Sequence, residues 1–157
     1  FLLVDLLAKN HTASPWKEDK KFEAYVSDLQ IDGVSILLAK PTTYMNRSGD
    51  ALQNIISFYK LNPATQVLVL TDDLDIPLGT VRFRLSGGAG THNGLKSIVA
   101  IVGEAFPRLR LGIGPKSEVM DLADWVLSKM TTEEEALLLQ SEKEVEKSVG
   151  EVLSLRS

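Results

Sequence analysis

Apolar residues recur every three to four positions in several stretches of the chain, which is the spacing of one face of an α-helix. This pattern predicts helices over residues 1–10, 49–60, 93–102, 122–126 and from 132 onward. Ser48 is the predicted N-cap of the second helix, and Asn62 followed by Pro63 is predicted to end it. Thr132 and Glu135 have the spacing of a capping box at the start of the last helix.

Shorter apolar runs, continuous or alternating with polar residues, predict β-strands. They lie at residues 22–30, 34–39, 67–70, 80–85 and 109–113. The first two are joined by turn residues and form a predicted hairpin. The third, VLVL, is typical of a strand that is buried on both faces. In the fourth, Val81, Phe83 and Leu85 are predicted to point inward, and Arg82 and Arg84 outward.

The alternation of these strands and helices predicts the fold class α/β: a single domain over residues 1–157 with a twisted mixed β-sheet flanked by helices. A chain of 157 residues with 44% hydrophobic residues can bury one core. No apolar run approaches the ~18 residues of a transmembrane helix, so we expect no membrane association. The absence of cysteine excludes disulfides and thiolate nucleophiles and fits a reducing compartment, so we expect a cytoplasmic protein.

Charge is distributed unevenly along the chain, although its formal net value is only −4. Residues 131–157 hold seven glutamates and three basic residues, and the preceding 130 residues hold 14 acidic and 14 basic ones. A nucleic-acid partner would therefore need a local basic patch. Two pairs of arginines supply candidates, because Arg82 and Arg84 share a face of one strand, and Arg108 and Arg110 share a face of another.

Three carboxylates, Asp72, Asp73 and Asp75, directly follow the apolar run at 67–70. Three interpretations are open on this pattern. The carboxylates could bind a divalent metal, although the chain offers only two histidines as further ligands. They could belong to a solvated turn between a strand and the next element. Alternatively, one of them could orient a general base at the carboxyl end of the strand, where ligands of open α/β sheets gather.

Two loops carry further candidate chemistry. SGGAGTHNG, residues 86–94, has four glycines in nine residues, which suits either a phosphate or sugar cradle or a mobile surface loop. His92 and Asn93, at the start of the following helix, are either caps or catalytic groups. Tyr44, Met45 and Asn46 would suit a stacked base or a peptide backbone, or could instead pack into the core and cap a helix. Without a G-x-S-x-G motif or a cysteine, a hydrolase would use an activated water.

Four ordered motifs resemble those of the bacterial-type peptidyl-tRNA hydrolase family. They are KPTTYMNRSG (40–49), TDDLDIPLG (71–79), GAGTHNGLKS (88–97) and RLRLGIG (108–114), and the similarity runs over essentially the whole chain. That family cleaves the ester that links a stalled peptide to the 3′ ribose of tRNA. The resemblance therefore implies hydrolysis of peptidyl-tRNA by a histidine-activated water, without a metal or an organic cofactor. It implies no obligate protein partner, and we expect a monomer.

The resemblance also assigns roles to individual residues. Asp72 matches the carboxylate that steadies the catalytic histidine. Asn46 and Asn93 match amides that hold the peptide–ribose end of the substrate, with the aromatic Tyr44 beside them. The residues that match the clasp on the tRNA end are Arg84 and Arg110.

Part of the family pattern lies outside this sequence. The catalytic histidine of the family falls just before the helix that begins here at Phe1, together with an Arg-x-Asn stretch, a glycine-rich turn and the first strand. We therefore expect residues 1–157 to be an N-terminally truncated domain that is inactive by itself. The alternative is a non-catalytic RNA-binding relative, similar to the plant organelle splicing factors that share this fold.

Overall fold

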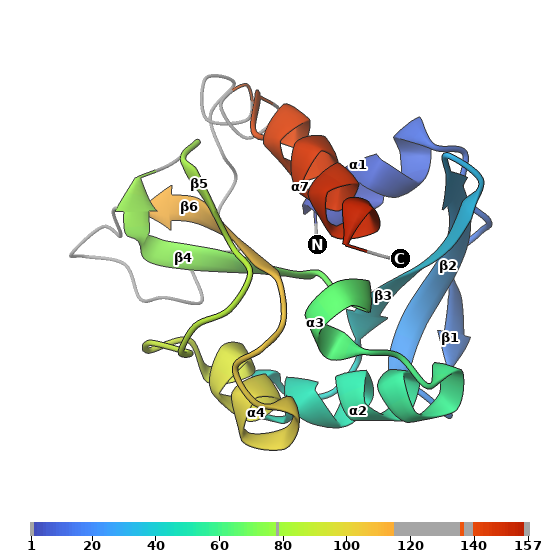
Figure 1. Ribbon diagram of the computed structural model, residues 1–157, viewed down its shortest axis with the longest axis horizontal. Helices are drawn as coiled ribbons and strands as arrows, with labels where there is room; N and C mark the ends of the chain where they lie inside the picture. The colour runs from blue at the N-terminus through green and yellow to red at the C-terminus, as the bar shows by residue number, and fades with distance from the viewer. Residues whose placement is uncertain (1, 78, 115–135, 137–139, 156–157) are drawn as a thin grey trace.

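The computed structural model describes residues 2–77, 79–114, 136 and 140–155 (Figure 1). Its elements, in chain order, are α1 (Leu2–Asn10), β1 (Lys17–Asp19), β2 (Ala24–Ile31), β3 (Val34–Pro41), the 3₁₀ turn η1 (Met45–Arg47), α2 (Ser48–Tyr59), α3 (Pro63–Gln66), β4 (Val69–Pro77), β5 (Val81–Arg84), α4 (Asn93–Val102), β6 (Arg108–Gly114) and α7 (Glu142–Ser154). The α/β class expected from the sequence is confirmed. The predicted short helix at 122–126 and the capping box at 132–135 lie outside the described residues.

The strands form two three-stranded sheets, where the sequence had suggested one. The first sheet, in the order β1-β2-β3, is antiparallel and contains the predicted hairpin. Strands β2 and β3 pair from Ala24 opposite Pro41 down to Ile31 opposite Val34. Asp32 and Gly33 form the connecting turn with φ values of 52° and 77°. Positive φ at both positions is the requirement of the tight turn that matches strand twist, and an Asp-Gly pair favours it.

The second sheet, in the order β4-β6-β5, is mixed. Strand β6 pairs in parallel with β4 and antiparallel with β5. Strand β4 corrects the sequence prediction: it runs from Val69 to Pro77, whereas the predicted strand ended at residue 70. The acidic run therefore lies inside a strand and is not a turn. Strand β6 pairs with β4 up to Asp73 opposite Gly112 and again, after an irregularity, at Pro77 opposite Gly114. This pairing accounts for the extra length, and it was not visible in the local sequence.

Helices cover the strands from two sides. Figure 1 shows α1 and α7 together on one side, and α2 and α4 together on the other. The first pair closes a core that includes Leu7, Leu109 and Val145. On the other side, Leu95, Ile98 and Phe106 form a cluster around α4. Each helix in the described part of the chain is too short or too polar to span a lipid bilayer.

Helix α2 differs from the prediction at both ends, since it starts at Ser48 and already stops at Tyr59, with Lys60 and not Asn62 at its end. Arg47 is its N-cap, whereas Ser48 is its first residue and donates its hydroxyl to the Met45 carbonyl at 2.9 Å. The preceding 3₁₀ turn explains this shift, because the chain is already turning before Ser48. Asn62 caps α3, an element that the sequence did not predict, by accepting a hydrogen bond from the Ala64 amide at 3.0 Å.

Helices α2 and α4 cross closely at Gly49, whose amide donates to Oγ of Ser97 at 2.9 Å. A Cβ at this position would press on the Ser97 backbone carbonyl. We expect Gly49→Ala to lower the free energy of unfolding by about 1–3 kcal/mol, the usual cost of overpacking. Gly150→Ala is the matched control, because Gly150 of α7 has open space around it and should gain about 0.5–1 kcal/mol from the better helix former. Urea unfolding of both variants tests the crossing, and an unchanged Gly49→Ala variant would contradict it.

Candidate active site

Strand β4 and the N-terminus of α4 meet at a carboxylate–imidazole contact. Nε2 of His92 lies 3.3 Å from Oδ1 of Asp72, and both side chains are partly exposed. The other ring nitrogen of His92, Nδ1, accepts a hydrogen bond from the Leu95 amide at 3.1 Å and so caps α4. Of the two roles open for His92, the structure shows the cap. The structure also shows a bond from His92 to Asp72, which no local pattern in the sequence indicated.

The hydrogen bond from His92 holds the pKa of the Asp72 carboxyl below its usual value, against partial burial, which acts to raise it. The Asp72 side chain is nevertheless 43% exposed, so the carboxylate is open to a second partner. At neutral pH this group is an anion that accepts hydrogen bonds. It can orient an imidazole, as the third interpretation of the acidic run required.

His92 is badly placed to act as a general base itself. Its Nδ1 atom is committed to the Leu95 amide and its Nε2 atom faces Asp72. The second histidine, His11, bonds through Nε2 to both carboxylate oxygens of Glu146 at 2.9 and 3.0 Å, on the α1–α7 side of the molecule. Both histidines of the 157-residue sequence are thus engaged in other contacts.

The turn η1 packs against the start of α4 and brings its polar residues to the same place. Met45 lies against Gly94 of α4, since a Cβ added to Gly94 would be 2.7 Å from Sδ of Met45. Asn46 follows Met45 in this turn, and Asn93 is the first residue of α4. Tyr44 is 81% exposed, which excludes the interpretation that it packs into the core. The turn η1, with Asn46, therefore lies beside the start of α4, where Asn93 follows His92 and His92 contacts Asp72. We call Asp72 with these two segments the Asp72 cluster.

A basic face begins next to this cluster. In the β5–β6 pairing Arg82 lies opposite Arg110, and Arg84 lies opposite Arg108, so all four share one face of the second sheet. They line a hollow of about 280 Å³ together with Ser86, Gly87 and Gly88. The two arginine pairs of the sequence thus form a single patch. The predicted inward residue Leu85, just beyond the end of β5, is instead 52% exposed.

The four arginines differ in their surroundings. Arg108 is buried, with 1% exposure, and donates to the carbonyls of Glu104 at 2.6 Å and Phe106 at 3.1 Å. Its pKa is lowered by burial and by the neighbouring Arg110. Both Arg108 and Arg110 donate to the Gly88 carbonyl, at 3.4 and 3.0 Å, so they hold the glycine-rich loop. The exposed residues of the face are Arg82 and Arg84.

Asp73 connects the basic face to its neighbour on β4, Asp72. Its Oδ2 atom lies 3.5 Å from Nη1 of Arg110, and its Oδ1 accepts the Asp75 amide at 2.8 Å. Because successive strand residues point to opposite sides, Asp73 serves the arginines while Asp72 serves His92. A solvated turn was one of the interpretations open for Asp73, and its partner Arg110 follows only from the β4–β6 register.

The metal interpretation finds little support in this geometry. Within residues 2–77, 79–114 and 140–155, no three side chains of His, Cys, Asp or Glu are grouped so that they could hold a metal ion. Asp72 and Asp73 diverge across the strand, which explains why adjacent carboxylates do not form a ligand set.

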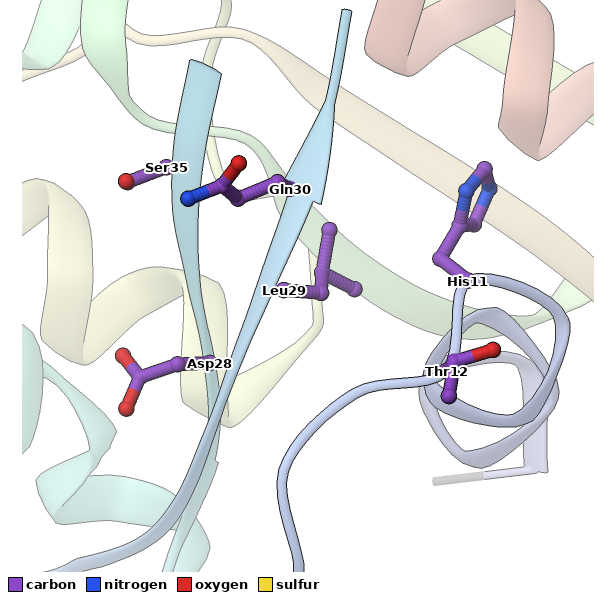
Figure 2. A pocket seen from close by; sticks show the side chains of 6 residues that line it. All are labelled: His11, Thr12, Asp28, Leu29, Gln30 and Ser35. Atoms are coloured by element: carbon purple, nitrogen blue, oxygen red, sulfur yellow. The ribbon is translucent and has the colours of Figure 1, made fainter. Parts of the chain in front are cut away.

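A second hollow, of about 430 Å³, lies by the first sheet between the end of α1 and strands β2 and β3. It is lined by His11, Thr12, Asp28, Leu29, Gln30 and Ser35. Figure 2 shows the Asp28 carboxyl directed away from the His11 ring. The polar groups that line this hollow do not converge on a common point. The Asp72 cluster is therefore the better candidate site.

The sequence profile for peptidyl-tRNA hydrolase matches residues 1–156. The chain belongs to the peptidyl-tRNA hydrolase family. A peptidyl-tRNA hydrolase of Carboxydothermus hydrogenoformans is 48% identical over 88% of this chain and 72% of its own. That of Chloroflexus aggregans is 44% identical over 98% of this chain and 81% of its own. The crystal structure of peptidyl-tRNA hydrolase from Acinetobacter baumannii superimposes with a TM-score of 0.81 at 33% identity, covering 99% of this chain and 82% of the other.

Membership of the peptidyl-tRNA hydrolase family confirms the resemblance inferred from the four motifs. Three of these motifs contribute to the Asp72 cluster: the first supplies η1, the second β4 and the third the start of α4. The fourth motif is β6, which supplies Arg108 and Arg110 to the basic face. The motifs are thus far apart in sequence but adjacent in the fold.

Proposed function

We propose that the protein hydrolyses the ester bond between peptide and tRNA in peptidyl-tRNA and so recycles tRNA from stalled translation. The observation that carries the proposal is the adjacency of two chemistries on one strand. Asp72 faces a cluster suited to an ester and a peptide, and Asp73, the next residue, contacts Arg110 of a face suited to a polyanion. A substrate with a peptide ester at the end of an RNA would occupy both.

The site residues receive the following roles in this proposal. Asp72 orients the general base, and Asn46 and Asn93 hold the peptide–ribose end through their amides. Tyr44, exposed beside them, offers its ring to the same end of the substrate. The tRNA end binds to the exposed guanidinium of Arg84 and to the partly exposed one of Arg110.

The general base is proposed to be a histidine outside residues 1–157, because both histidines of these residues are engaged in other contacts. It would take a proton from water, and the resulting hydroxide would attack the ester carbonyl carbon. The bond between the carbonyl carbon and the 3′ oxygen of the ribose then breaks. The ribose oxygen leaves as a hydroxyl after it receives a proton. The products are a peptide carboxylate and tRNA with a free 3′ hydroxyl. We expect residues 1–157 alone to leave the ester intact.

The test uses the protein expressed from its complete gene and a peptidyl-tRNA in water enriched in oxygen-18. One heavy oxygen should enter the carboxylate of the released peptide, and none should enter the 3′ hydroxyl of the tRNA. Heavy oxygen in the tRNA would overturn attack at the carbonyl carbon. Binding of peptidyl-tRNA without any release would favour the RNA-binding alternative, which relatives named as peptidyl-tRNA hydrolases do not support.

We expect the protein to act in the cytoplasm, where peptidyl-tRNA is made, and to bind tRNA as a monomer. Sedimentation of the protein with and without tRNA tests the last point, since a one-to-one complex should form from a monomer.

A further inference from the structure

The imidazole of His92 is fixed from several directions. The Leu95 amide donates to Nδ1 at 3.1 Å, and Nε2 lies 3.3 Å from Oδ1 of Asp72. The ring also lies against Gly94, where a Cβ would be 2.9 Å from Cε1 of the imidazole and 2.7 Å from Sδ of Met45. Gly94 thus leaves room for the ring and for η1 at once. A helix cap alone would not need the far side of the ring to be placed in this way.

The direction of the Leu95 bond determines where the imidazole proton lies. A backbone amide can only donate, so Nδ1 must be the unprotonated nitrogen. The neutral ring then carries its proton on Nε2, and that proton points to Asp72. Helix α4 therefore selects the tautomer that donates to the carboxylate. The opposite tautomer would lose both hydrogen bonds.

From this geometry we propose that His92 is a positioning residue of the reaction: its Nε2–H group holds Oδ1 of Asp72, so that the rest of the carboxylate faces the general base. The inference rests on the proposed hydrolase function. It assigns His92 no contact with the substrate and no proton transfer. Its effect passes through Asp72, which must itself be oriented before it can orient another group.

Two features of Asp72 support this role. Its side chain is 43% exposed, so without a partner it would be free to change rotamer. The hydrogen bond from His92 is also the main cause of the lowered pKa of this carboxyl. Asp73 and Asp75 on the same strand raise no competing demand on His92, since Asp73 bonds to Arg110 and to the Asp75 amide.

Two substitutions separate the cap from the contact with Asp72. His92→Asn keeps an acceptor near the position of Nδ1 for the Leu95 amide but has no atom near the position of Nε2. His92→Gln keeps an amide that can reach Asp72 but is a poor N-cap. We expect the Asn variant to retain its thermal stability and lose about tenfold in kcat with little change in KM, as for other supporting residues. The Gln variant should be less stable but closer to the wild type in kcat.

A readout that does not use activity accompanies the kinetics. Carbon-13 NMR of the Asp72 carboxyl should show a higher pKa in the Asn variant than in the wild type, and the Gln variant should lie between them. If kcat followed thermal stability, with Gln the worse variant, or if the pKa of Asp72 did not move, His92 would be a helix cap only. Failure of the proposed function looks different, because the wild type would then release no peptide while the NMR shift could still appear.

Discussion

Replacing Asp72 with asparagine should lower kcat for peptidyl-tRNA hydrolysis by about 10²-fold, the scale of general acid–base effects, with little change in substrate affinity. The His92 contact gives this substitution a specific consequence. The Nε2–H group of His92 will attract the amide oxygen of the new side chain, since that is its acceptor. The amide NH₂ group is then left to face the general base. A donor in that position opposes the tautomer in which the base can accept a proton from water.

Asp75→Asn is the matched control for this experiment. Asp75 lies on the same strand, is exposed, and uses its backbone amide to bond Asp73, so its side chain can lose its charge without disturbing that contact. Single-turnover rates and equilibrium binding should be measured for both variants. A loss of affinity with an unchanged rate in Asp72→Asn would make Asp72 a binding residue. Equal losses in both variants would point to an effect of net charge.

Elements that depend on neighbours in the sequence could be predicted. The Asp32-Gly33 turn carries its own conformational preference, and the β2–β3 hairpin follows from it. Helix α4 starts after His92 and ends just before Gly103, as the pattern indicated, because a cap and a positive-φ glycine are local signals.

Features that depend on pairing between distant segments could not be predicted. The acidic run looked like a turn because aspartate and proline are turn formers, but β6 holds it in a strand. Strand β6 needs Gly112 for this pairing, because a Cβ at Gly112 would collide with the carbonyls of Ile76 and Pro77 in β4. Register also decides that Asp73 meets Arg110. No pattern along one strand contains this information.

Burial of a charged residue was equally hidden from the sequence. Arg108 and Arg110 are two positions apart in an alternating strand and looked equivalent. The structure buries Arg108 against the Phe106 ring, 3.9 Å from its centroid, and leaves Arg110 partly exposed. Arg108 is therefore a support of the glycine-rich loop, while Arg84 is an exposed cation whose one described hydrogen bond is to the adjacent Phe83 carbonyl.

Because Arg84 is exposed whereas Arg108 is buried, Arg84→Glu should weaken the binding of tRNA. Each phosphate contact releases counterions, so log K falls with log salt by about 0.7–0.9 per contact. Reversal of Arg84 should flatten this slope by about one contact. Lys147→Glu on α7 makes the same change in net charge at an exposed position in another element, and it should leave the slope unchanged.

A small peptidyl-nucleotide ester that lacks the tRNA body separates binding from chemistry. The Arg84→Glu variant should cleave it almost normally, because Arg84 has no described hydrogen bond to the loop at 86–91 or to Asp72. Arg110→Glu should impair both substrates, since Arg110 holds the Gly88 carbonyl and contacts Asp73. Both variants should be assayed on both substrates across a range of salt. Equal damage to both substrates in Arg84→Glu would mean that Arg84 supports the active-site loop, and its assignment to the tRNA end would be wrong.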